Sequence, residues 1–229
     1  MTAMIPLIVL ASLATVFFIV VRVTKGGVPG LLTKTFASVC FIALGVAGAL
    51  SLYPHIEKSA ILILFGLVMG LIGDIVLDLK IIYPESNDLY LNSGMISFGV
   101  GHFLYLAAII LLISFNLTTL LVCIAITLPI SALIMFASKL IKIHFGKFIV
   151  HAVLYTIILV FMSVYTIVLA IADTKFSLMA VGMVLFLLSD LVLSPMYFAG
   201  KQDDKFMCVA NHTLYYAAQI CIAAFIFFI

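Results

Sequence analysis

The chain has 229 residues, of which 66% are hydrophobic and 9% are charged, and its formal net charge is +2. Soluble domains carry about 25% charged residues, so this composition excludes a soluble globular protein, because too few polar side chains remain to cover its surface. The small net charge, with Lys and Arg spread over short loops, provides no basic patch for nucleic-acid binding.

Eight apolar segments follow one another along the chain, each near the roughly 20 residues that a helix needs to cross a bilayer. Gly26 and Gly27 separate the first two segments, and Tyr53-Pro54 ends the second. The polar residues 84–92 predict the longest loop, and Pro129 predicts a kink in the fifth segment. The predicted spans are residues 3–23, 34–53, 59–79, 94–114, 117–136, 148–171, 176–196 and 206–228.

The distribution of basic residues predicts the orientation of these spans. The loops after the odd-numbered spans, counted with their helix ends, carry nine Lys and Arg residues, whereas the opposite loops carry two, Lys58 and Lys175. By the positive-inside rule, the odd-numbered loops are cytoplasmic and both termini lie on the non-cytoplasmic side. The nine residues are Arg22, Lys25, Lys34, Lys80, Lys139, Lys142, Lys147, Lys201 and Lys205.

Two carboxylates, Asp74 and Asp190, lie deep inside apolar segments of similar sequence. GLVMGLIGDIVL (66–77) and GMVLFLLSDLVL (182–193) agree at six of twelve positions. An ionisable residue within a membrane span is costly, so it indicates a functional site by default. The structural alternative is that each Asp only hydrogen-bonds neighbouring helices.

A second repeated block contains histidine and tyrosine. GHFLYLAAII (101–110) and NHTLYYAAQI (211–220) agree at six of ten positions. We therefore predict an all-α membrane protein with a single transmembrane domain, residues 1–229, built from two parallel four-helix pseudo-repeats, residues 1–114 and 115–229. Counting about 1.5 Å per residue from the predicted span ends places the repeated Asp and His in the cytoplasmic half of the bilayer. The repeated candidates are Asp74, Asp190, His102, His212, Tyr105 and Tyr215.

Other polar residues have weaker interpretations. Lys34 opens the second span, where its ammonium either anchors the helix at the lipid headgroups or binds a substrate phosphate. Gln219 is a candidate to orient a substrate oxygen, whereas Asp78, one turn past Asp74, is interpreted as a solvated charge at the helix end. His151 adds a third imidazole at similar depth, but no spacing such as HExxH supports a zinc or iron site, so we expect no metal and no cofactor.

Four blocks carry a family resemblance: GLIGD (70–74), GMISFGVGHFLY (94–105), FLLSD (186–190) and YYAAQ (215–219). Together, in this order and spacing, they resemble the YhhN-like family of integral membrane proteins, whose characterised animal members are lysoplasmalogenases. The chain departs from the family pattern at Lys34-Thr35, where Lys-Pro is usual. It also departs at Gly70, where Ser is usual, and at Asp78, where an apolar residue is usual.

The resemblance implies hydrolysis of the vinyl-ether bond of a lysoplasmalogen to a fatty aldehyde and a glycerophospho-headgroup, without a metal. This chemistry requires one protonated carboxyl and one carboxylate, and Asp74 and Asp190 are the candidates for these two roles. The substrate would be a lysophospholipid taken directly from the surrounding membrane lipid. The residues expected to bind it are Lys34, His102, Tyr105, His212, Tyr215 and Gln219.

Two other functions fit the same residues. Eight spans with buried Asp and His are compatible with a proton-coupled transporter, but the spans lack the paired Gly and Pro interruptions of many transporter helices. A metal-dependent membrane lipid hydrolase is the other alternative. In each case we expect an integral multi-pass protein, in the plasma or inner membrane of a bacterium or in the endoplasmic reticulum of a eukaryote.

Overall fold

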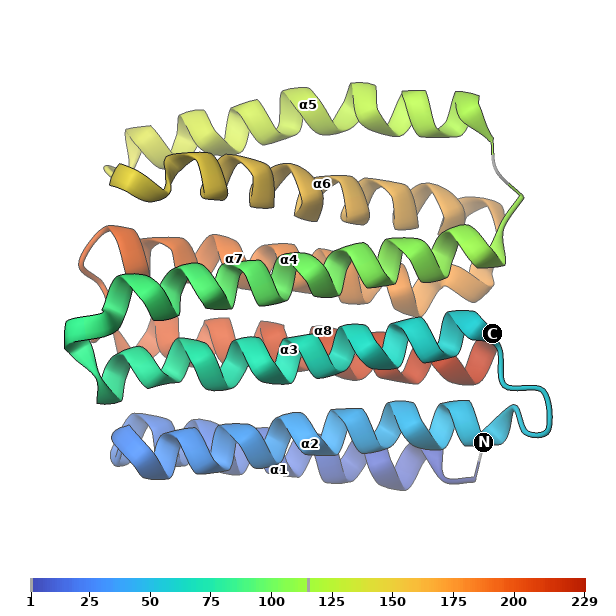
Figure 1. The fold of residues 1–229 in the computed structure, drawn as a ribbon, viewed down its shortest axis with the longest axis horizontal. Helices are drawn as coiled ribbons and strands as arrows, with labels where there is room; N and C mark the ends of the chain where they lie inside the picture. Colours follow the sequence, from blue (N-terminus) through green and yellow to red (C-terminus); the bar gives the residue numbers. More distant parts are fainter. Residues whose placement is uncertain (1, 115) are drawn as a thin grey trace. The chain divides into compact units, whose positions relative to one another are not determined.

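A computed structural model describes residues 2–114 and 116–229, and within these residues every regular element is a helix. Eight of the described helices are long and apolar enough to cross a membrane, which confirms the predicted all-α, multi-pass class. They are α1 (Met4–Thr24), α2 (Gly27–Ser51), α3 (Lys58–Ile82), α4 (Asn87–Leu112), α5 (Leu117–Leu140), α6 (Ile149–Ala172), α7 (Ser177–Phe198) and α8 (Lys205–Phe225), shown in Figure 1. The short 3-10 turns are η1 (Pro84–Ser86), η2 (Gly146–Phe148), η3 (Thr174–Phe176) and η4 (Ile226–Phe228).

Helix α2 begins earlier than predicted, at Gly27 rather than at residue 34. The chain enters the helix through Gly26 and its first residue Gly27, whose φ angles of +61° and +49° lie in the left-handed region that glycine adopts without strain. Pro29 is then accommodated in the first helical turn, where a backbone N–H would have no partner within the helix. The early start matters because it places residue 34 inside the helix instead of at its end.

The prediction of a long loop over residues 84–92 is wrong. Pro84–Ser86 forms a 3-10 turn, and Asn87 already begins α4. The polar residues of this stretch therefore belong mainly to the first turns of a helix, and the connection between α3 and α4 is short.

The chain divides into two compact units, which are described separately. The first comprises Met1–Ile113 with Gln219–Ile229, and the second comprises Ser114–Ala218. Helix α8 therefore contributes residues to both units. The predicted halves 1–114 and 115–229, and the location of both termini on the non-cytoplasmic side, stay predictions.

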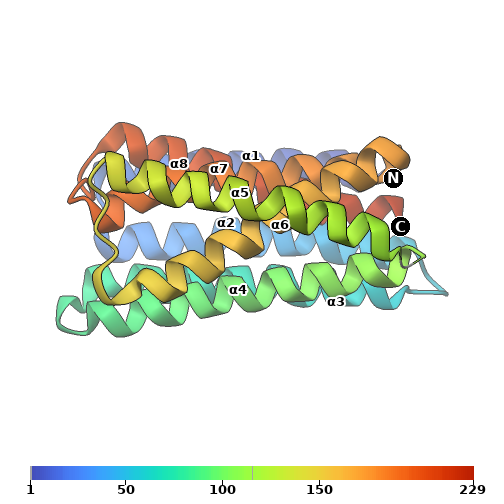
Figure 2. The same ribbon diagram turned by 90° about the horizontal axis from the view of Figure 1, so that it is seen from above.

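In the first unit, α2 packs against both α1 and α3, and the most extensive helix–helix contact is between α3 and α4. These two helices run alongside one another in both views (Figure 1, Figure 2). Glycines make this close approach possible, as is common between membrane helices. A Cβ at Gly66 would lie 2.3 Å from Tyr105 Cε1, and one at Gly94 would lie 2.4 Å from Leu77 Cδ2. The Tyr105 ring therefore occupies the space that a side chain at position 66 would fill.

In the second unit, α6 packs against both α5 and α7. The Asn116 side chain caps α5 by accepting a hydrogen bond from the backbone N–H of Thr119 at 3.1 Å. Pro129 lies within the single continuous helix α5. This unit carries Asp190 on α7 and His212 on α8.

Candidate functional site

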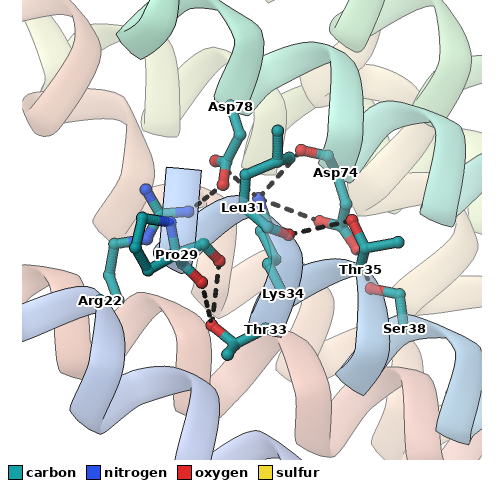
Figure 3. A network of polar contacts seen from close by, with 10 residues as sticks. Arg22, Pro29, Leu31, Thr33, Lys34, Thr35, Ser38, Asp74 and Asp78 are labelled. Carbon is teal, nitrogen blue, oxygen red and sulfur yellow. Dashed lines mark hydrogen bonds and ion pairs between the residues drawn. The ribbon is translucent and has the colours of Figure 1, made fainter. Parts of the chain in front are cut away.

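Helices α2 and α3 each present two polar side chains one turn apart, on faces that contact each other. Lys34 and Ser38 lie on α2, and Asp74 and Asp78 lie on α3. A spacing of four residues puts both members of each pair on the same helical face. All four are buried, with exposed fractions between 0% and 5%. Figure 3 shows them pointing toward one another from the two helices.

Both oxygens of the Asp74 carboxylate have a partner on α2. The Ser38 hydroxyl donates a hydrogen bond to Oδ2 at 2.7 Å. The Lys34 ammonium lies 3.2 Å from Oδ1 and 3.4 Å from the backbone carbonyl oxygen of Asp74. Charge-assisted bonds of this kind are the stronger ones in proteins, so the pair holds the carboxylate in one orientation.

Asp78 is not the solvated charge that we predicted from its position near the helix end. It is 5% exposed, and its Oδ1 lies 3.2 Å from the Lys34 ammonium. Its other carboxylate oxygen forms an ion pair with Arg22 of α1. The reason is tertiary packing, since a second cation from a different helix reaches the carboxylate and replaces water.

Arg22, which the sequence indicated only as a marker of membrane orientation, lies within the candidate site through its ion pair with Asp78. It is the only arginine in the chain, and its guanidinium carbon lies 5.4 Å from the centroid of the Phe18 ring. A Cβ at Gly30 would lie 3.3 Å from that guanidinium carbon, so the absence of a side chain there gives the guanidinium room. The usable signal was Asp78, which lies on the same helical face as Asp74.

The cluster formed by Arg22, Lys34, Asp74 and Asp78, here called the ionic cluster, contains two cations and two anions (Figure 3). Lys80, which is partly buried on α3, acts electrostatically on both Lys34 and Asp78. Burial of single charges in the membrane is costly, so pairing is the condition under which this cluster is stable.

Three further predicted residues lie together in the first unit. The rings of His102 and Tyr105 meet edge to face, with centroids 5.9 Å apart. The Tyr105 hydroxyl donates a hydrogen bond to Oε1 of Gln219 at 3.3 Å. All three are buried, and Asp74 acts electrostatically on Tyr105. The structure thus groups these residues near Asp74, and their role in substrate binding stays a prediction.

In the second unit, Asp190 is half-buried on α7, and the side chain of Tyr155 on α6 forms a hydrogen bond with it. The preceding residue, Ser189, is held by Asn211 of α8, whose amide nitrogen donates to the Ser189 carbonyl at 2.9 Å and to its hydroxyl at 3.0 Å. Tyr155, Ser189 and Asn211 were not predicted as neighbours that hold Asp190 in place. The signal for Asn211 was its polar amide within an apolar span, directly before His212.

The predicted residues His212 and Tyr215 also lie in the second unit, on α8. Tyr215 is buried against Phe186, with the ring centroids 5.4 Å apart, whereas His212 is partly exposed. Lys147, one of the basic residues that predict the orientation of the spans, is exposed and lies over the Phe148 ring.

The histidine that raised the question of a metal site, His151, is exposed. In the described parts of the chain, no three side chains of His, Cys, Asp or Glu lie together as a group that could hold a metal ion. The charged groups that lie together in the first unit are two carboxylates, an ammonium and a guanidinium.

The sequence model of the YhhN family matches residues 30–226 of this chain. The chain belongs to the YhhN family. The YhhN match includes Lys34, Asp74, Asp78 and Asp190, whereas Arg22 precedes it. A search of the curated proteins found no match, and a search of the solved structures found none. Membership of the YhhN family, confirmed here, is consistent with a membrane hydrolase.

Proposed function

We propose that this YhhN protein is a membrane-embedded hydrolase that cleaves the vinyl-ether bond of lysoplasmalogens. The products would be a fatty aldehyde and a glycerophospho-headgroup. The observation that carries the proposal is the buried Asp74, whose two oxygens accept bonds from Lys34 and Ser38. It supports an acid–base reaction inside an apolar environment, where a single-chain lipid is already dissolved.

The reaction requires a carboxylic acid and a carboxylate. Protonation of the β-carbon of the vinyl ether creates an oxocarbenium ion, and water then adds to the α-carbon to give a hemiacetal. The hemiacetal breaks down to the aldehyde and the glycerol hydroxyl. One carboxyl delivers the first proton, while a carboxylate stabilises the cation and removes a proton from the attacking water, as in glycoside hydrolysis.

We assign the carboxylate role to Asp74, because a carboxylate rather than a carboxylic acid suits an ammonium on one oxygen and a hydroxyl donor on the other. Asp190 is the candidate acid. Tyr155 forms a hydrogen bond with its side chain, and Asn211 forms one with the preceding residue, Ser189. The Lys34 ammonium already contacts two carboxylates, so we assign it to orienting Asp74 rather than to binding a phosphate.

The remaining predicted residues are candidates to bind the lipid. Tyr105 and Gln219 form one hydrogen-bonded pair, and His102 packs against the Tyr105 ring. Such amphipathic side chains combine an apolar surface for a fatty chain with polar atoms for a glycerol hydroxyl. Tyr215 and His212 have the corresponding chemistry in the second unit.

The test is aldehyde release from lysoplasmenylethanolamine and lysoplasmenylcholine by purified protein, with and without a chelator. Asp74→Asn and Asp190→Asn keep the side-chain volume and remove the ionisable group, and we expect each to lower kcat by about 100-fold or more. Asp173→Asn is the matched control, because Asp173 is an exposed residue whose carboxylate caps a 3-10 turn outside the candidate site.

The proposal fails if the folded protein releases no aldehyde from either lipid. In that case a proton-coupled transporter, tested by solute uptake into proteoliposomes, becomes the leading alternative. Activity lost to the chelator would instead favour a metal-dependent hydrolase. Equal activity of Asp74→Asn and Asp173→Asn would remove Asp74 from the reaction.

A further inference from the structure

The ionic cluster contains one more carboxylate than the proposed chemistry uses. Asp74 needs a single cation, Lys34, and yet the Lys34 ammonium lies 3.2 Å from a carboxylate oxygen of Asp74 and 3.2 Å from one of Asp78. Asp78 therefore competes with Asp74 for the same ammonium. Without Arg22, the buried charges of Lys34, Asp74 and Asp78 sum to −1, which is costly in an apolar environment. Lys80 also acts electrostatically on Asp78, but it is only partly buried and so offsets this charge less than a buried cation does.

Arg22 resolves this competition. It reaches Asp78 from α1 and pairs with Oδ2, whereas the Lys34 ammonium lies 3.2 Å from Oδ1. Its guanidinium is confined by Phe18 and by the close backbone of Gly30, which fixes its approach to Asp78. The side chains of Arg22 and Asp78 are only 8% and 6% exposed, so water does not replace this pairing.

We propose that Arg22 is a positioning residue of the active site: it neutralises Asp78, so that the charge of Lys34 remains available to hold Asp74. This inference rests on the proposed function and deepens it. It brings helix α1 into the site, although α1 lies outside the segment that matches the YhhN family.

The inference makes an asymmetric prediction for three variants. Arg22→Met leaves Asp78 to draw Lys34 away from Asp74, so kcat should fall by about tenfold or more while KM changes by less than about threefold. Asp78→Leu removes the competitor, so kcat should stay within about threefold of the wild type, with a lowered melting temperature because Arg22 is left buried and unpaired. In Arg22→Met/Asp78→Leu, both kcat and the melting temperature should return toward the wild type.

Lys25→Leu is the matched control. It removes a positive charge from the same end of α1, but Lys25 is exposed, and it should leave kcat unchanged. The inference is overturned if Arg22→Met keeps the kcat of the wild type, or if the double variant is as impaired as Arg22→Met. If Arg22→Met cannot be purified folded, the double variant decides: wild-type kcat supports the inference, and a folded but inactive double variant overturns it.

A second measurement does not need the substrate, so failure of the proposed function can be distinguished from failure of this inference. Dicyclohexylcarbodiimide enters membranes and reacts with protonated carboxyls, and mass spectrometry locates the product. If the folded wild type releases no aldehyde, this labelling alone decides. Loss of Arg22 should then cause labelling at Asp74 or Asp78 that is absent from the wild type, and Arg22→Met/Asp78→Leu should abolish it. Unlabelled Arg22→Met, or equal labelling of the double variant, would overturn the inference.

Discussion

The packing of Tyr105 over Gly66 provides a stability prediction that does not depend on the proposed chemistry. In Gly66→Ala, the new methyl group would lie 2.3 Å from Cε1, 2.7 Å from Cδ1 and 2.9 Å from Cζ of the Tyr105 ring. Carbon atoms in contact lie about 3.5–4.0 Å apart, so the ring or the helix must move by more than about 1 Å. The ring has little room to do so, because Tyr105 is 2% exposed and is tied to Gln219 by its hydroxyl.

The magnitude follows from two costs and one gain. Overpacking of this kind costs about 1–3 kcal/mol, and a hydrogen bond between membrane helices contributes on average about 0.6 kcal/mol. Alanine favours a helix over glycine by up to about 1 kcal/mol, which offsets part of the loss. We therefore expect Gly66→Ala to lower the free energy of unfolding by about 1–3 kcal/mol.

The assay is thermal unfolding of the purified protein in detergent, where about 1 kcal/mol corresponds to roughly 2–4 °C for a chain of this size. Gly99→Ala is the control, because a Cβ at Gly99 of α4 meets no atom within 4 Å and should cause no loss. Adding Tyr105→Leu to Gly66→Ala should recover part of the lost stability, with a coupling of about 1 kcal/mol or more. Equal melting temperatures for Gly66→Ala and Gly99→Ala would refute this reasoning.

Three further variants test the polar contacts. Ser38→Ala removes the hydrogen-bond donor to Oδ2 of Asp74. Because the carboxylate is then less well oriented, we expect kcat for aldehyde release to fall by about tenfold. An unchanged kcat would exclude Ser38 from the site. Lys34→Met leaves two buried carboxylates without their shared cation, so it should lower the free energy of unfolding by about 3–5 kcal/mol in thermal unfolding. A variant as stable as the wild type would contradict this ion pairing. Asn211→Leu removes both hydrogen bonds to Ser189, and we expect the free energy of unfolding, measured in the same way, to fall by about 1–2 kcal/mol. An unchanged free energy of unfolding would show that these bonds do not stabilise the protein.

The number and class of the helices could be predicted from the sequence, because apolar runs of sufficient length are a local property. The starts of α2 and α4 could not be predicted well. The predicted spans 34–53 and 94–114 begin later than these helices. Pro29 fits the first helical turn of α2, and polar side chains are tolerated where a helix leaves the apolar region. The errors therefore lie where local composition does not distinguish a helix end from a loop.

The candidate site was predictable only in part. Asp74, with its cost inside a span, indicated a site directly, and the YhhN motifs reinforced it. The burial of Asp78 and the role of Arg22 depend on the packing of α1, α2 and α3, which the apolar pattern does not specify. Residues that contact each other across 56 positions of sequence, as Arg22 and Asp78 do, leave no local signal.

The order of charges along the chain has a consequence for membrane insertion. Both cations of the ionic cluster, on α1 and α2, leave the ribosome before either carboxylate of α3, since Lys34 and its partner Asp78 are 44 residues apart. The apolar stretch of α2 is also less hydrophobic than those of α1 and α3. An unpaired lysine in a weakly apolar segment partitions poorly into lipid. We therefore expect α2 to enter the bilayer together with α3, as a helical hairpin in which Lys34 is paired with the two carboxylates.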